Sequence, residues 1–280
     1  MPIRIVVDSS ADFDRTEAKR LNIDIVPMSI QFGDQSFLDG ISLSKADFYK
    51  QLSEGSANPY TAQPAPSDFL PYLQAAKEAG DEVLIITISS VLSGTYQSAV
   101  ISKTMCDYSP IYIIDSLTAT AGIQILAEEA CRLRDLRYSA AQITQELENL
   151  KPHIRIFAIV DTLEYLRRGG RLSNFQAGLG TVTKLKPVLT VREGSVVVVG
   201  KSFGQTAAMK QMLKFLDSHP ISDNYPAIAL TSDDPTRENA LIHGLNVQSG
   251  LPKILRHCSI GPTIGAHIGP GAVGIAYVEE

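Results

Sequence analysis

The length and composition of the chain, 280 residues with 44% hydrophobic and 20% charged, suit a globular protein with two domains of ~140 residues each. Its 25 basic and 30 acidic residues give a net charge of −5, so electrostatics provides no reason to expect nucleic acid or an anionic membrane as a partner. The chain opens on a strand-like segment and has no apolar run of ~18 residues, so we expect a cytoplasmic protein with neither signal peptide nor membrane span.

In the first half of the chain, apolar runs alternate with segments of helical character. Strands are predicted at residues 3–7, 83–88 and 111–114, an extended segment at 23–32, and helices at 14–21, 44–54, 66–80, 94–105, 120–135 and 139–150. Such alternation is typical of a mainly parallel sheet with helices on both faces. We therefore predict an α/β domain over residues 1–152.

The second half, residues 153–280, predicts a second α/β domain with a mixed or antiparallel sheet flanked by helices. Strands at 188–191 and 196–199, joined by Glu193-Gly194-Ser195, indicate an antiparallel hairpin. Further strands are predicted at 154–160, 227–231, 253–258 and 274–278, and helices at 162–168, 206–217 and 236–249.

Three predicted strands of the first half end in small polar residues. The side chains concerned are those of Asp8, Ser9, Ser10, Ser89, Ser90, Asp115 and Ser116. In an open parallel sheet the ligand crevice lies beyond the carboxyl ends of the strands, so these turns are expected to line one edge. The alternative is that each polar residue only caps a helix.

The densest candidate site is the turn at residues 88–99, I-S-S-V-L-S-G-T-Y-Q-S-A. Ser93 and Gly94 fall where a helix should begin, and the free N–H groups of a helix start attract anions. Capping needs one hydroxyl, whereas this turn has Ser89, Ser90, Ser93 and Thr95 within seven residues. A nucleophile elbow is excluded because Val91 stands where its first glycine belongs, and a phosphate-binding P-loop because its lysine is missing.

Three other segments carry candidate polar side chains. Thr61 and Gln63 lie in T-A-Q-P-A-P, which is either a rigid connector or a stiff loop that presents them to a ligand. Arg171 follows a Gly-Gly stop and either complements a helix dipole or delivers a guanidinium inward. His267 lies in a glycine-rich segment, residues 261–274, and either faces a ligand or fills the core. Neither the three cysteines nor the five histidines have metal-site spacing, so no metal is expected.

Taken in order, seven segments across the whole chain resemble the DegV family of bacterial fatty-acid-binding proteins. They are V-D-S-S-A-D near the start, F-L-D-G at 37–40, T-A-Q-P-A-P at 61–66, S-G-T-Y-Q-S-A at 93–99, Y-L-R-R-G-G-R-L-S at 165–173, L-K-P-V-L at 185–189 and G-P-T-I-G-A-H-I-G-P-G-A-V-G at 261–274. The resemblance implies two α/β domains with a long-chain fatty acid bound between them. It implies a binding subunit rather than an enzyme, without a further cofactor, that presents the acid to a separate ATP-dependent fatty acid kinase for lipid synthesis.

The resemblance also implies roles for individual residues. Thr61 and Ser93, with Gly94 beside it, would hold the carboxylate, and Arg171 and His267 would complete the polar network. Ser89, Ser90, Thr95, Asp115, Ser116 and Gln63 are the expected supporting residues. Two departures from the family pattern are Ala62, where serine is usual, and Phe203, where we expect an arginine that faces the kinase; the second puts the kinase partnership in doubt.

Two alternatives from other classes stay open at this point. The first is a hydrolase in which Ser93 acts with His267 and Asp115. The second is a regulatory module that binds another small anion, for which a shallow hydrophilic pocket near Ser93 would be expected. A long apolar pocket would instead favour the fatty acid.

Overall fold

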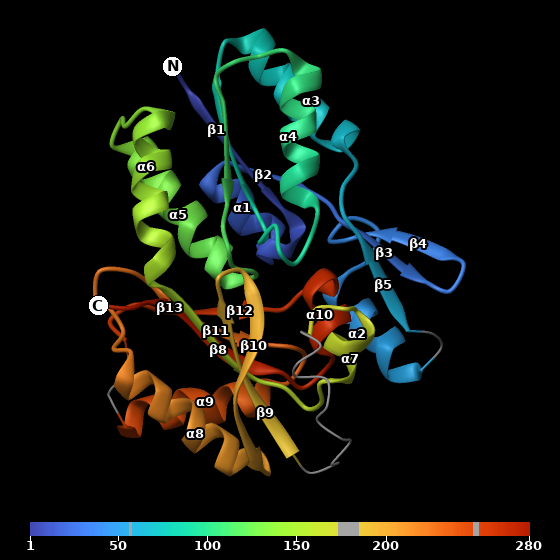
Figure 1. Cartoon of the computed structure of the whole chain (residues 1–280), viewed down its shortest axis with the longest axis vertical. Coiled ribbons are helices and arrows are strands. Elements are labelled where there is room, and N and C mark those ends of the chain that lie inside the picture. The colour runs from blue at the N-terminus through green and yellow to red at the C-terminus, as the bar shows by residue number, and fades with distance from the viewer. Residues whose placement is uncertain (56–57, 173–184, 249–251) are drawn as a thin grey trace.

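The apolar runs of the first half pair into a parallel sheet, which confirms the predicted architecture of this part of the chain (Figure 1). The computed structural model describes residues 1–55, 58–172, 185–248 and 252–280, so Ser173 and Ser249, the last residues of two predicted segments, lie outside it. The sheet has the order β2-β1-β6-β7 with every pair parallel. Its strands are β1 (Ile3–Asp8), β2 (Ile23–Val26), β6 (Glu82–Thr87) and β7 (Ile111–Asp115).

Helices cover both faces of this sheet because neighbouring side chains of a strand point to opposite faces. Val6 and Ile85 face one apolar cluster with α3 and α4, whereas Ile5 and Ile86 face another with α5 and α6. The helices of this half are α1 (Arg15–Leu21), α2 (Lys45–Glu54), α3 (Pro66–Ala79), α4 (Thr95–Cys106), α5 (Ala121–Asp135) and α6 (Ala140–Leu150).

A small antiparallel sheet corrects two predictions about the first half. Residues 23–32 are not one extended segment: β2 belongs to the parallel sheet, whereas β3 (Ser29–Phe32) lies in a separate sheet of order β4-β3-β5, with β4 (Gln35–Leu38) and β5 (Pro59–Ala62). Thr61 is therefore on a strand, paired with Ile30, and not on a loop. The ladder with β3 holds the backbone of Thr61 in place.

The second half forms a mixed sheet of order β10-β9-β8-β13-β11-β12, as predicted. Its only parallel pair among the described residues is β11 with β12. The predicted hairpin is confirmed; its turn residues Glu193 and Gly194 have φ values of 48° and 79°, the left-handed conformation that such tight turns require. The strands are β8 (Ile154–Ile159), β9 (Leu185–Arg192), β10 (Ser195–Phe203), β11 (Ala227–Thr231), β12 (Leu255–Ser259) and β13 (Val273–Val278).

Helix α5 lies between the two large sheets and joins their cores. Residues of β1, β6, α5, β8 and β11 belong to one continuous apolar cluster, whose members include Ile5, Leu126, Ile156 and Leu230. The opposite face of the mixed sheet is covered by α8 (Gln205–Ser218) and α9 (Pro235–Gln248) (Figure 1). The strands of the parallel sheet all precede residue 152 and those of the mixed sheet all follow it. The division into two domains stays a prediction, since the two halves share this core.

The glycine-rich segment near the C-terminus contains a helix that was not predicted from the sequence. Residues Pro262–Ile268 form the short helix α10, which packs against α2, β5 and α7 (Glu164–Arg168). A side chain at Gly265 would overlap the ring of Phe48, so glycine is required there for close packing. The expected positive φ values occur after the helix, at Gly269 and Gly271. Within the described residues, no helix is long and apolar enough to cross a membrane.

Candidate functional site

An apolar pocket lies between the two large sheets, at the carboxyl edge of the parallel sheet. The polar residues at the strand ends predicted a ligand site at this edge. The empty volume of the pocket is about 850 Å³, including space open to solvent, which is within the usual range of ligand sites. The lining side chains come from both halves of the chain and are Met28, Thr61, Ile88, Leu92, Ser93, Ala119, Thr120, Ile156, Ala158, Leu166, Arg171, Leu189, Thr190, Val191, Val196, Leu230, Ile260, Thr263, Ile264, His267 and Ile268.

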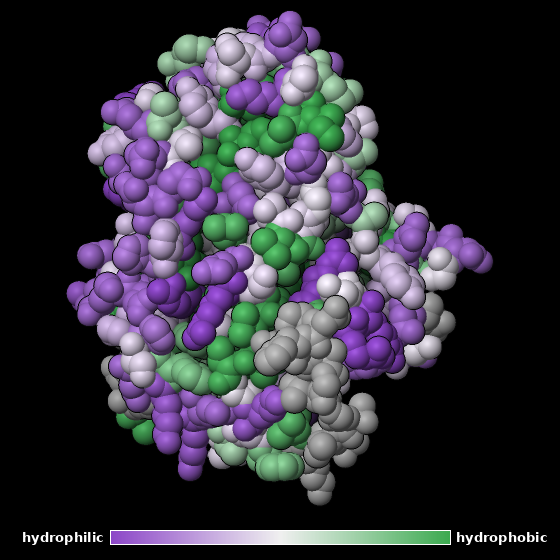
Figure 2. Space-filling model, viewed as in Figure 1, coloured by the Kyte–Doolittle hydropathy of each residue, from purple (hydrophilic) through white to green (hydrophobic). Residues whose placement is uncertain are grey.

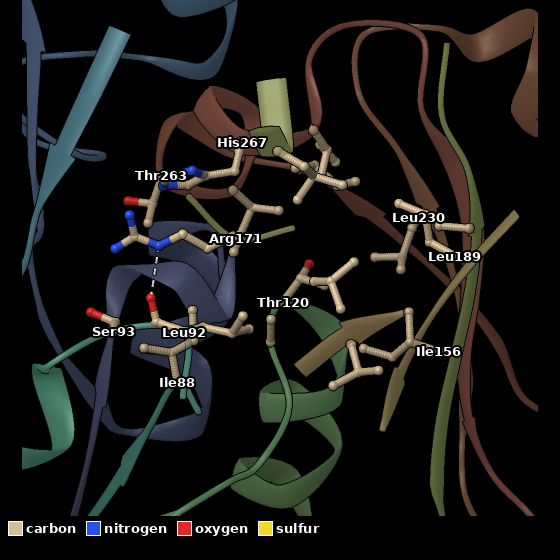
Figure 3. Close-up of a pocket in the computed structure, with 18 of the residues that line it drawn as sticks. Ile88, Leu92, Ser93, Thr120, Ile156, Arg171, Leu189, Leu230, Thr263 and His267 are labelled. Carbon is tan, nitrogen blue, oxygen red and sulfur yellow. Dashed lines mark hydrogen bonds between the residues drawn. The ribbon is translucent and has the colours of Figure 1, made fainter. Parts of the chain in front are cut away.

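Most of the polar side chains of this pocket gather at one end. Figure 3 shows Ser93, Arg171, Thr263 and His267 on one side of the space, Ile156, Leu189 and Leu230 on the other, and Thr120 between them. Thr61 belongs to the polar end, because its Oγ1 lies 2.8 Å from Nε2 of His267. The pocket is thus amphipathic: both charged or ring donors, Arg171 and His267, lie at one end, and the other end is mainly aliphatic.

Ser93 is presented by the loop between β6 and α4. Its Oγ lies 2.8 Å from the hydroxyl of Thr95, so one predicted supporting residue contacts it directly. The helix begins at Thr95 with Gly94 as N-cap, and no side chain caps it among the described residues. Gly94 does not line the pocket; its Cα faces the Gln63 amide, which a methyl group there would overlap. The Ser93 hydroxyl is therefore not used as a helix cap.

Arg171 and His267 are brought together by the Gly169-Gly170 turn after α7. The Arg171 Nε donates to the carbonyl of Leu92 at 3.0 Å, and Nη1 donates to the carbonyl of Gly169 (Figure 3). These bonds aim the guanidinium at the polar end of the pocket. A Cβ on Gly169 would overlap Nδ1 of His267, so the glycine makes room for the imidazole. The alternative role of Arg171, complementing a helix dipole, does not explain the bond to Leu92 in the other half.

His267 is held in its neutral form by its surroundings. Burial first and the neighbouring Arg171 second lower the pKa of its imidazole to about 4. Its Nδ1 is buried and has no partner among the residues that the structure describes. Near neutral pH the ring therefore adds no charge to the site, and the guanidinium of Arg171 is the positive group at the polar end.

The remaining predicted residues lie outside the lining of the pocket. Among them, Ser89 links the two halves of the chain and Asp115 links two turns at the sheet edge. The Ser89 Oγ donates to the carbonyl of Gly194 at 2.8 Å, which ties the turn to the β9–β10 hairpin. Asp115 accepts from the N–H groups of Ser90 and Leu117 at 3.0 and 3.1 Å. The Ser116 Oγ bonds within its own turn, to the carbonyl of Thr118 at 3.3 Å.

These bonds bear on the hydrolase alternative. Its three residues do not form a hydrogen-bonded triad among the described residues, because Ser93 contacts Thr95, His267 contacts Thr61 and Asp115 binds backbone N–H groups. A serine nucleophile requires a base within hydrogen-bond reach that a third group orients. The geometry therefore gives the hydrolase alternative no support.

Three pocket threonines, Thr120, Thr190 and Thr263, were not predicted from the sequence. Thr120 has φ 47° and ψ −128°, an unusual conformation for a β-branched residue. Its hydroxyl donates to Oδ2 of Asp12 at 2.6 Å. The Thr263 hydroxyl donates to Asp39 in the same way. Asp39 belongs to the F-L-D-G segment, which singled out the position without showing its contact.

Asp12 and Asp39 are buried acids, 4% and 6% exposed, behind the pocket. Burial is the main cause that raises the pKa of both carboxyls above the usual range, that of Asp12 to about 7. Asp12 also accepts from the N–H of Gly261 at 2.9 Å, and Lys45 donates to the Asp12 carbonyl at 3.0 Å. These contacts hold the start of α10 against the first half.

Replacing Asp12 by asparagine is expected to flatten the pH dependence of stability. Because the folded pKa exceeds the unfolded value, the native state keeps a proton that the unfolded state releases, so stability falls as pH rises from about 4 to about 7. The effect is on the order of a few kcal/mol. Urea unfolding midpoints across this range, with exposed Asp34→Asn as control, measure it. A slope in Asp12→Asn parallel to wild type would show that Asp12 does not carry this effect.

Figure 2 shows hydrophobic side chains in the middle of this face, with hydrophilic ones mainly to the left and right of them. Among the described residues, no group of three His, Cys, Asp or Glu side chains is arranged to hold a metal ion. The fold and the pocket thus define a class: α/β proteins with a parallel and a mixed sheet that enclose an amphipathic pocket.

Comparisons with known proteins identify the family within this class. The family model described as DegV, an uncharacterised protein family, matches residues 2–280. The chain therefore belongs to the DegV family, which confirms the resemblance seen in the sequence.

Individual relatives match over nearly their whole length. A DegV domain-containing protein of Caldanaerobacter subterraneus subsp. tengcongensis is 33% identical over 99% of both chains. The solved structure of a DegV family protein from Thermus thermophilus, described by its fatty acid binding, is 33% identical, with a TM-score of 0.90 over 99% of this chain and 100% of that one. DegV of Bacillus subtilis, described as a fatty acid binding protein, is 26% identical, with a TM-score of 0.88 over 100% of both chains.

Proposed function

We propose that this protein binds a long-chain fatty acid, with its carboxylate at the polar end of the pocket and its alkyl chain among the aliphatic side chains. The observation that carries the proposal is the amphipathic pocket itself. Its polar end matches the carboxylate of a fatty acid, and its aliphatic end matches the alkyl chain. Two relatives with the same fold are described as fatty acid binding proteins. The apolar lining does not suit the alternative of a small hydrophilic anion.

The carboxylate would be held by the hydroxyls of Thr61 and Ser93 and by the guanidinium of Arg171. Hydrogen bonds in which one partner is charged are about twice as strong as neutral ones. His267, neutral and 2.8 Å from Thr61, orients that hydroxyl without adding a second charge. This donor set balances a single negative charge in a largely buried site.

Most of the affinity would come from the alkyl chain. At ~0.8 kcal/mol per buried CH₂, a ~16-carbon chain contributes on the order of 10 kcal/mol before the costs of ordering it. The polar end then sets the orientation of the ligand. In this view the protein is a carrier, and Ser93 is a hydrogen-bond donor rather than a nucleophile.

Presentation of the bound acid to a separate ATP-dependent kinase is the further part of this proposal. It rests on the family resemblance. Phe203, which stands where an arginine facing the kinase was expected, weakens this part of the proposal. Phe203 ends the edge strand β10 and is 72% exposed, so the position that differs from the family pattern lies on the surface. An exposed aromatic residue at this place would suit a partner with a less acidic contact surface than an arginine would.

The binding proposal predicts that protein purified under mild conditions carries a long-chain fatty acid. Mass spectrometry of the denatured sample would identify the acid, and titration of delipidated protein would measure its affinity. We expect one acid per chain and binding that depends on chain length. If the extracts contained no acid and the delipidated protein bound none, the proposal would be wrong.

A further inference from the structure

The tip of the β9–β10 hairpin, residues 191–196, forms part of the apolar wall of the pocket. Val191 and Val196 line the pocket from this tip, and Ile156 lines it from the neighbouring strand β8. In Figure 1 the hairpin rises out of the mixed sheet toward the first half of the chain. The tip therefore closes one side of the space that the alkyl chain would occupy.

The hairpin tip is not paired with strand β8. The pairing of β9 with β8 covers Val188 to Thr190 and stops there, although β9 continues to Arg192 and β8 extends back to Ile154. Beyond Thr190 the tip keeps the ladder within the hairpin, which ends at Arg192 opposite Ser195. Within the described part of the chain, the tip thus lacks the backbone bonds that hold the rest of β9 in the sheet.

A β-bulge lies at the base of the tip. The register of β10 against β9 shifts between Val198 and Gly200. A bulge interrupts the ladder and bends the strand that contains it. The hairpin therefore has a point at which its outer part can bend relative to the sheet.

The tip contacts the first half of the chain at the turns that follow β6 and β7. The Ser89 Oγ donates to the carbonyl of Gly194 at 2.8 Å, and among the described residues this is the only hydrogen bond from the tip to the first half. A methyl group on Gly194 would lie 3.0 Å from Cγ2 of Val91 and 3.3 Å from Cδ2 of Leu117. These two side chains are 58% and 40% exposed, so they bury little apolar surface against the tip.

The turns that receive the tip are themselves well held. The Asp115 carboxylate accepts from the N–H groups of Ser90 and Leu117 at 3.0 and 3.1 Å, which joins the two turns. The N–H of Ser89 also donates to the carbonyl of Thr118 at 2.9 Å. Of the two sides of this contact, the hairpin tip is therefore the one that can move.

The contacts between the two halves are unequal around the pocket. At the polar end, His267 contacts Thr61, Arg171 donates to the carbonyl of Leu92, and Asp12 binds the start of α10. At the hairpin tip, one hydrogen bond and two partly exposed side chains join the halves. The least costly place to open the pocket is the one with the fewest contacts.

We propose that the hairpin tip is the entrance through which the alkyl chain reaches the apolar pocket. The tip moves away from Ser89, the chain enters sideways between the halves, and the tip closes over it. The inference rests on the proposed function, because it requires an alkyl chain as the ligand. On this path the chain stays against apolar side chains such as Val191 and Val196, and it does not have to displace water from the guanidinium of Arg171.

The first test is Ser89→Ala, which removes the hydrogen bond at the tip. Palmitate loading and its release to albumin are timed by stopped flow on the delipidated full-length protein. We expect both rates to rise about fivefold, the factor that the loss of one net hydrogen bond gives. The equilibrium affinity should change by less than about twofold, because the bond closes the tip over an empty and over a filled pocket alike. The matched control is Ser90→Ala, an exposed hydroxyl of the same turn, which should change neither rate.

The second test locks the tip with a disulfide. The variant carries Val91→Cys and Gly194→Cys in the Ser89→Ala background, since the short distance from a Cβ at position 194 to Cγ2 of Val91 suits a disulfide and the Ser89 hydroxyl would overlap that Cβ. The oxidised and reduced forms of this one chain are compared, so the strain of a cysteine at φ 79° is common to both. Oxidation should slow loading and release by roughly tenfold or more, and dithiothreitol should restore them. The three native cysteines are buried.

Equal palmitate exchange by the oxidised and reduced forms would overturn this inference, and so would unchanged rates in Ser89→Ala. If the disulfide does not form, the rates of Ser89→Ala against those of Ser90→Ala decide. Either negative result leaves the proposed function intact as long as palmitate binds at equilibrium. If the wild-type protein bound no palmitate, the proposed function itself would fail.

Discussion

A variant with alanine at both Thr61 and Ser93 is expected to lose fatty acid affinity by roughly two to four orders of magnitude. Each lost hydrogen bond to a charged group costs about 1.5–3 kcal/mol, and tenfold in affinity corresponds to about 1.4 kcal/mol. The two hydroxyls lie on different elements, β5 and the loop before α4, so their single effects should be measured separately as well. Calorimetric titration of delipidated protein with palmitate gives these numbers.

Two controls separate loss of donors from loss of structure. Ser90→Ala removes an exposed hydroxyl from the same turn, outside the pocket, and should leave affinity unchanged. Thr61→Ser keeps the oxygen that contacts His267 and should retain most of the affinity. Full affinity in the double variant would show that the carboxylate is held elsewhere, and the assignment of Thr61 and Ser93 would then have to be given up.

Replacing Leu189 by tryptophan is expected to block the apolar end and to shorten the preferred ligand. Leu189 is 5% exposed and lies opposite the polar end, so the larger indole would occupy space that the chain needs (Figure 3). Each CH₂ that no longer enters the pocket removes ~0.8 kcal/mol, so exclusion of ~4 carbons would cost palmitate roughly two orders of magnitude or more in affinity. A short acid such as octanoate should still bind.

The chain contains no tryptophan, so the introduced indole also reports on the pocket by fluorescence. The matched control is Leu216→Trp. This leucine is also 5% exposed, but it packs in the cluster between α8 and the mixed sheet, outside the pocket. Both substitutions overpack the interior, at about 1–3 kcal/mol of stability. Only Leu189→Trp should change the preference for chain length; equal loss for octanoate and palmitate would contradict this placement of the alkyl chain.

Local sequence patterns were sufficient to predict most elements of the fold. The runs around Ile5, Ile85 and Ile113 are buried strands that alternate with amphipathic helices, and this pattern led to the parallel sheet. The split of residues 23–32 between two sheets could not be predicted, because strand pairing depends on distant partners. Thr61 pairs with Ile30 from β3, and no local signal marks that pairing.

The candidate site was also predicted only in part. The many hydroxyls in one turn indicated Ser93, and the neighbouring glycines indicated Arg171 and His267. Thr120 and Thr263 went unnoticed, because what distinguishes them is a bond to a buried carboxylate from a distant segment, Asp12 or Asp39.

The sequence by itself determined the class of fold, the family and the polar turn, since these depend on periodicity and on short motifs read along the chain. Only the tertiary structure decided that Thr61 and His267, 206 positions apart, contact each other at one end of an apolar pocket. The physical reason is that the burial of a residue, its pKa and the direction of its hydrogen bonds depend on which residues packing brings next to it. These neighbours are far apart in the sequence, so local sequence patterns do not reveal them.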